Sequence, residues 1–298
     1  MTINQDTPPA LEPGGARSVR TRRRPRRSNH GPLLTYAALV VAAAITLLPF
    51  AWMLLGSFKT QGEILRNPTG FIPQHPTLSN YTTWFGELHI GTFFLTSLIV
   101  AVFTVLGNLL FCSMVGYALA KMDFPGKRLL FVLVMITLMV PGVVTFVPLF
   151  VLVGKLGLIN TYPALILPFL TSPLGVFLMR QFIQGIPDSL LEAARLDGLG
   201  EFGAFFRVVL PLCGPPLATL GILTFLGSWN NFLWPLVAAQ SEDKYTLPVA
   251  LSLFSTGQQA TNYGLLLAGS TLVITPIVLL FIALQRFFIQ SVASAGIK

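Results

Sequence analysis

Charged residues are unusually scarce in this sequence. Only 10% of its 298 residues are Asp, Glu, Lys or Arg, whereas 53% are hydrophobic and the mean hydropathy is +0.73. About a quarter of the residues in an ordinary soluble domain are charged, so the composition excludes such a domain at this length. The excess apolar surface must be solvated by lipid.

Cysteine and histidine are also scarce, with two Cys and three His in the whole chain. Cys112 lies within a long apolar run and Cys213 at the edge of another, so we expect small packing residues and no exported disulfide. The His residues show no metal-site spacing. Gly126-Lys127 is followed by Arg128 and lacks the glycine of a phosphate loop. The sequence therefore predicts no metal site, and no cofactor bound by the chain itself.

Six apolar runs contain no Asp, Glu, Lys, Arg or His, and each approaches or exceeds the ~20 residues that cross a bilayer. They cover residues 33–55, 92–118, 129–153, 161–179, 217–239 and 265–283. A proton- or ion-coupled transporter usually needs titratable groups inside the membrane. Each such group costs roughly 2.5–3.5 kcal/mol at a helix centre. The runs predict an all-α integral membrane protein with six transmembrane helices, driven by energy that enters from outside the bilayer.

Positive residues are distributed unevenly between the loops. With both termini in the cytoplasm, fifteen of the 19 Lys and Arg residues fall on the inner side, as the positive-inside rule predicts. Seven of them lie between Arg17 and Arg27, ahead of the first span, so the net charge of +8 reflects topology anchoring and predicts no nucleic-acid partner. Residues 1–32 are rich in Pro, Gly, Arg and Ser and predict a disordered basic cytoplasmic tail. The folded unit is expected to cover residues 33–298.

A charged segment interrupts the apolar runs between the fourth and fifth spans, on a loop of residues 186–216 that the topology places in the cytoplasm. It reads Glu192-Ala193-Ala194-Arg195-Leu196-Asp197-Gly198 and closes at Leu210-Pro211. Ser189 and Glu192 fit a capping box, with Asp188 as a competing cap. Gly198 is placed to end the helix in a left-handed conformation. A helix of about two turns is marginal alone, and spacing leaves partner docking and local capping equally open.

The order Glu-Ala-Ala, two residues, Asp-Gly and a short helix ending in Pro resembles the coupling loop of bacterial ATP-binding-cassette (ABC) importer permeases. Leu199 stands where Ala is usual. Gly116-Tyr117-Ala118-Leu119-Ala120, Phe124-Pro125-Gly126 and the run from Trp229 to Pro235 are similar to the carbohydrate-uptake branch, most of all to the second permease subunit of maltose-type systems. The resemblance covers residues 33–298 and implies a type I ABC importer permease fold in the bacterial plasma membrane.

The resemblance also implies partners. These are a second, homologous permease, a cytoplasmic ATPase dimer that binds ATP and Mg, an exported substrate-binding (lipo)protein and a sugar. This chain would be a non-catalytic subunit. Residues expected to couple it to the ATPase are Glu192, Ala193, Ala194, Arg195, Asp197, Gly198, Glu201 and Pro211.

Two further sets of residues have open interpretations. Trp229, Asn230 and Asn231 could line the translocation pathway or make interhelix hydrogen bonds. By the same resemblance, residues 240–262, with Tyr245, Gln258 and Gln259, correspond to the region of the maltose-type subunit that reaches into the docked binding protein. The alternative is that they form a solvated loop. Glycerol phosphate or another small polar solute is the alternative cargo. An integral-membrane lipid enzyme is a remote alternative, because the charged cluster has helix-cap rather than acid–base spacing.

Overall fold

The structure is a computed structural model that describes residues 30–255 and 261–295, with side chains for residues 34–255 and 261–283. The chain divides into two units, residues 1–49 and 50–298, which are described separately. In the first unit, α1 (His30–Gly56) begins, and its side chains from Leu34 to Phe50 are exposed. A helix that is apolar on every side is typical of a membrane span.

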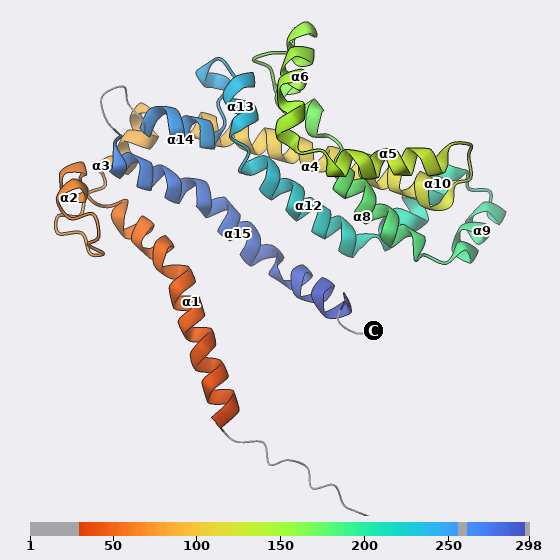
Figure 1. The fold of residues 1–298 in the computed structure, drawn as a ribbon, viewed down its shortest axis with the longest axis horizontal. Helices are drawn as coiled ribbons and strands as arrows, with labels where there is room; N and C mark the ends of the chain where they lie inside the picture. Colours follow the sequence, from red (N-terminus) through yellow and green to blue (C-terminus); the bar gives the residue numbers. More distant parts are fainter. Residues whose placement is uncertain (1–29, 256–260, 296–298) are drawn as a thin grey trace, which may run out of the picture. The chain divides into compact units, whose positions relative to one another are not determined.

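Residues 50–298 form a helical unit (Figure 1). After the end of α1 come the short helices α2 (Gln61–Arg66) and α3 (Ser79–Thr82). The remaining α-helices are α4 (Ile90–Lys121), α5 (Lys127–Met139), α6 (Gly142–Lys155), α7 (Tyr162–Ile166), α8 (Pro173–Gln184), α9 (Asp188–Leu196), α10 (Glu201–Ala204), α11 (Leu210–Leu212), α12 (Gly214–Trp229), α13 (Leu233–Ala238), α14 (Leu247–Ser255) and α15 (Tyr263–Ala295). Short π or 3₁₀ turns join several of them: η1 (Thr83–Glu87), η2 (Leu167–Phe169), η3 (Phe205–Val209) and η4 (Glu242–Lys244).

The central helix of this unit is α4, which packs along α8 and α12. A glycine on α4 lets α4 and α8 approach closely. A Cβ added to Gly116 would lie 2.9 Å from the Cβ of Met179 and 3.0 Å from the backbone nitrogen of Arg180. The backbones of the two helices are therefore in close contact at Gly116.

The prediction of six apolar helical spans is confirmed, but three of the spans are not single helices. Three stretches are individually long and apolar enough to cross a membrane: Leu34–Gly56, Ile90–Lys121 and Tyr263–Ala283. The others are bent pairs, at 104° between α5 and α6, 43° between Tyr162–Phe169 and α8, and 82° between Glu201–Leu212 and α12. The first arm of the last pair lies in the predicted cytoplasmic loop of residues 186–216, and only α12 falls within the predicted fifth run. A proline stands at each of these breaks, Pro141, Pro173 and Pro215, where it removes a backbone donor and restricts the residue before it.

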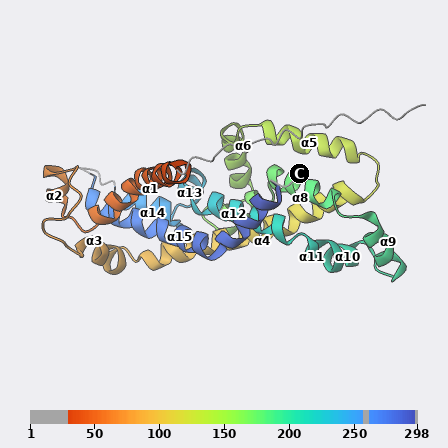
Figure 2. The same cartoon turned by 90° about the horizontal axis from the view of Figure 1, so that it is seen from below.

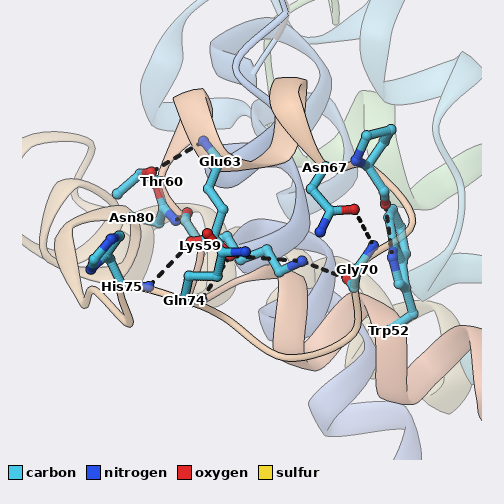
Figure 3. Close-up of polar contacts among 10 residues, drawn as sticks. Trp52, Lys59, Thr60, Glu63, Asn67, Gly70, Gln74, His75 and Asn80 are labelled. Carbon is cyan, nitrogen blue, oxygen red and sulfur yellow. Dashed lines mark hydrogen bonds and ion pairs between the residues drawn. The ribbon is translucent and has the colours of Figure 1, made fainter.

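The two ends of α4 carry different elements. Near Ile90 lie α3, η1 and α14, whereas α9 and α10 lie near Lys121 (Figures 1 and 2). At the first end, polar contacts order residues 59–80 (Figure 3). The buried Lys59 ammonium donates to the carbonyl of Gly70, and Glu63 accepts hydrogen bonds from the backbone N–H of Gln74 and of His75. Asn80 donates to the carbonyl of Lys59.

Candidate functional site: the segment from Asp188 to Leu212

The segment from Asp188 to Leu212, called here the coupling segment, begins with the amphipathic helix α9. Leu191 and Ala194, three residues apart on one face, are 3% and 4% exposed and join the apolar cluster beneath the helix. Glu192 and Ala193 point away from that cluster and are exposed. One face of the short helix is therefore held by the protein, and the other is free to contact a partner.

The capping box predicted for the start of α9 is wrong. The helix begins at Asp188, its N-cap is Pro187, and no side chain caps it. Pro187 already has the φ that a helix entry requires, and the Asp188 carboxylate is bound by Lys121, with 2.6 Å between Nζ and Oδ1. The hydrogen bond and the positive charge of Lys121 hold the pKa of Asp188 below its ordinary value.

The predicted left-handed end at Gly198 is confirmed. Gly198 has a φ of 82°, and its N–H donates to the carbonyl of Arg195 at 3.0 Å. The N–H of Leu199 donates to the carbonyl of Ala194, also at 3.0 Å. These two bonds form a Schellman motif, which commonly includes an apolar contact from the residue after glycine. Leu199, the departure from the usual Ala, makes that contact by packing on the core cluster.

Glu201, the first residue of α10, joins α9 to α4. One carboxylate oxygen accepts a hydrogen bond of 2.7 Å from the hydroxyl of Tyr117. The other oxygen pairs with the Arg195 guanidinium at 2.9 Å. Arg195, Glu201 and Tyr117 thus form one continuous polar chain from the end of the short helix to α4.

The exposed face of the segment combines charge with apolar side chains. Leu196 is 89% exposed and Phe202 70% exposed, so neither packs in the core. Phe205 does so, at 2% exposure. Glu192 lines a polar cavity of about 440 Å³ with Lys121 and Arg195. Within the described side chains, both cations pair with other carboxylates and Glu192 has no ionic partner.

Two of the expected coupling residues, Asp197 and Pro211, lie at or near the ends of short helices within the coupling segment. Asp197 is the exposed C-cap of α9, and Pro211 is exposed within α11. Cys213 is buried at the junction where the chain turns into α12. Of the expected coupling residues, the structure brings Glu192, Arg195 and Glu201 close to Lys121 or Tyr117, both on α4. These α4 residues were not expected as site residues, although Tyr117 lies within the Gly-Tyr-Ala-Leu-Ala run.

A second cavity, of about 340 Å³, lies between α4, α8 and α12. Asn231 lines it beside Ser228, whereas Trp229 and Asn230 do not. Trp229 is 1% exposed and its indole N–H donates to the carbonyl of Val273 on α15. Asn230 is exposed and donates to the carbonyl of Leu226. Trp229 therefore makes an interhelix hydrogen bond, which was one of its two expected roles, whereas Asn231 faces the cavity.

The cavity wall also contains Thr104 and Asn108, one helical turn apart on α4. Asn108 is held by a 2.8 Å hydrogen bond from the Ser172 hydroxyl. The Thr104 hydroxyl is buried and has no hydrogen-bond partner among the described residues. In the sequence, the only signal of this wall is that two polar residues stand four positions apart, among several other Thr and Ser residues of the same run.

The residues expected to contact the binding protein are only partly described. Tyr245 is half-buried and packs against the apolar cluster around Trp84 and Trp229. Gln258 and Gln259 lie outside the described residues. Nearby, the Asn160 side chain accepts hydrogen bonds from the backbone N–H of Gln240 at 2.9 Å and of Ser241 at 3.1 Å.

Comparison with known proteins identifies the class. Residues 112–294 match the family of binding-protein-dependent transport system inner membrane components, and the chain belongs to this family. The arabinooligosaccharides transport system permease protein AraQ of Halalkalibacterium halodurans is 46% identical over 86% of this chain and 92% of its own length. The diacetylchitobiose uptake system permease protein NgcG of Streptomyces coelicolor is 35% identical over 89% of this chain and 88% of its own.

A solved structure has the same fold. It is the crystal structure of a bacterial ABC transporter involved in the import of the acidic polysaccharide alginate, and the match has a TM-score of 0.78. It covers 89% of this chain and 100% of that one at 22% identity. The chain is therefore an inner-membrane permease component with an ABC importer permease fold.

Proposed function

We propose that this chain is the permease subunit of an ATP-driven sugar importer and that its coupling segment docks on a cytoplasmic ATPase. The exposed face of α9 supports the docking role, because Glu192 and Leu196 are exposed and Glu192 has no ionic partner among the described side chains. A helix of two and a half turns is marginal alone, so contacts on this face would add to those of its buried face. A basic side chain of the ATPase would pair with Glu192, and an apolar pocket would take Leu196 and Phe202. ATP and Mg belong to that ATPase, and this chain would transmit its closure to the spans.

The cargo we propose is an oligosaccharide. Relatives named for arabinooligosaccharides and for diacetylchitobiose support this class. The 340 Å³ cavity offers hydroxyl and amide groups from Thr104, Ser228 and Asn231, and its lining contains no Lys or Arg. That chemistry suits a neutral sugar better than glycerol phosphate, which needs cationic or backbone N–H donors. We place the pathway along this cavity.

The full importer would contain a second permease, two ATPase subunits and an exported binding protein, as the family description implies in general terms. We propose that residues 1–32 and both termini face the cytoplasm. Tyr245 and the neighbouring residues would then face the exported protein.

Exchange of Glu192 for Lys tests the coupling role. In the full importer, Glu192→Lys should abolish sugar uptake and reduce the ATPase that co-purifies with the permease, because it puts a cation against a cationic partner. Glu87→Lys, the same exchange at another exposed Glu that lies outside the coupling segment, is the matched control and should leave both unchanged. Normal uptake by Glu192→Lys, at wild-type amounts in the membrane, would contradict the proposal.

A further inference from the structure

We propose that Tyr117 and Lys121 are positioning residues that fasten the coupling segment to α4, so that movement of the segment enters the membrane domain through α4. This inference rests on the proposed function and adds the route by which motion is passed on. The two residues are four positions apart and lie on one face of the last turns of α4.

Lys121 holds the start of α9. Its ammonium donates to the Asp188 carboxylate at 2.6 Å and to the carbonyl of Ile186 at 2.6 Å. The Lys121 side chain is only 6% exposed, whereas that of Lys127 in the surface pair with Asp123 is 28% exposed. The Asp188 carboxylate is 76% exposed, so it is the second, carbonyl acceptor and the low exposure of the ammonium that hold Lys121 more firmly than Lys127, whose partner Asp123 is fully exposed to water and salt.

Tyr117 holds the other end of α9, through Glu201 and Arg195. It is 4% exposed, and its ring lies 5.5 Å from that of Phe205. Both the ring contact and the hydrogen bond to Glu201 therefore join α4 to residues 201–205. The helix between the two attachments cannot tilt or slide without breaking one of them.

The alternative route runs along the chain itself, from α11 into α12. There the helix direction changes by 82° and the chain passes a junction at Cys213. By contrast, α4 continues without a break for 32 residues and packs along both α8 and α12. An unbroken helix transmits displacement as a rigid body, whereas a bent joint can absorb it. The attachments to α4 are therefore the stiffer connection.

The test uses the complete importer in proteoliposomes with its binding protein, and measures sugar transported per ATP hydrolysed. Tyr117→Phe removes only the phenolic oxygen, so the complex should assemble and hydrolyse ATP while the ratio falls about tenfold, the scale of one hydrogen bond to a charged group. Lys121→Met should lower the ratio similarly. Tyr81→Phe, which removes a hydroxyl bonded to Ser57 near the other end of α4, is the matched control and should not change it.

Glu201→Gln keeps an acceptor for Tyr117 but loses the charge that binds Arg195, and should give an intermediate ratio. It also keeps the proposal testable if Tyr117→Phe does not assemble. Wild-type ratios in assembled Tyr117→Phe, or in Glu201→Gln and Lys121→Met, would overturn the inference. If the wild-type permease did not associate with an ATPase at all, the proposed function itself would fail.

Discussion

At the residue scale, Thr104 is one of three buried side chains, with Thr246 and Ser255, whose hydroxyl has no hydrogen-bond partner among the described residues, and it is the one of the three that lines the 340 Å³ cavity. A buried hydroxyl is costly unless it is paired, so retaining one suggests that a polar group of the cargo pairs with it.

Thr104→Val should therefore reduce uptake without weakening the fold. Valine keeps the shape, and no hydrogen bond within the described part of the protein is lost, so the free energy of unfolding should change by less than about 1 kcal/mol. Loss of one hydrogen bond to the sugar should lower uptake about two- to tenfold at limiting concentration. Thr137→Val is the control, since that hydroxyl donates only within its own helix. Unchanged sugar uptake in assembled Thr104→Val importer would count against this pathway.

The conformation of a single residue could be predicted where it depends only on residues nearby in the sequence. Gly198 was found from its place after a short helix, because the left-handed cap depends on a few neighbouring residues. The capping box at Ser189 failed because α9 already begins at Asp188, with Pro187 as its N-cap. The competing cap, Asp188, is bound instead by Lys121, 67 positions away. Tyr117 was missed as a site residue for the same reason, as its partner Glu201 is 84 positions away. Local spacing in the sequence does not show which residues, so far apart in the chain, become neighbours in the fold.

At the element scale, the packing of α4 on α8 depends on Gly116. Gly116→Ala places a methyl group 2.9 Å from Met179 Cβ and 3.0 Å from a backbone nitrogen, so the helices must separate. Such overpacking costs about 1–3 kcal/mol, and the midpoint of thermal unfolding of the purified protein should fall.

The matched control is Gly154→Ala on α6, where an added Cβ meets nothing within 4 Å. That exchange should leave the midpoint unchanged or raise it, because alanine favours a helix. Equal shifts for both variants would mean that the close approach of α4 and α8 contributes nothing to stability.

The helical character of each apolar run could be predicted from hydropathy, but the bends could not. Pro141 is the N-cap of α6 at the 104° bend, whereas Pro276 lies inside the continuous helix α15. A proline removes one hydrogen bond in either setting, and neighbouring helices decide whether the freed carbonyl is satisfied in a kink or in a break. Whether a proline gives a kink or a break therefore depends on the packing of neighbouring helices, which cannot be read from the sequence.

At the scale of the whole molecule, the distribution of charge and the position of the coupling segment give one consistent orientation. Fifteen of the 19 Lys and Arg residues share a side if the termini are cytoplasmic, and α9 then meets the compartment that holds ATP. The opposite end of α4, with the ordered residues 59–80, would face the exported binding protein.

Site-directed labelling tests this orientation with little background, because Cys112 and Cys213 are both fully buried. Cysteine at the exposed Gln74 should react with a membrane-impermeant maleimide on intact cells. Cysteine at the exposed Ser189 should react only after the inner membrane is permeabilised. Labelling of Ser189→Cys in intact cells would place α9 outside, where no ATPase could reach it, and the coupling mechanism would fail together with the orientation.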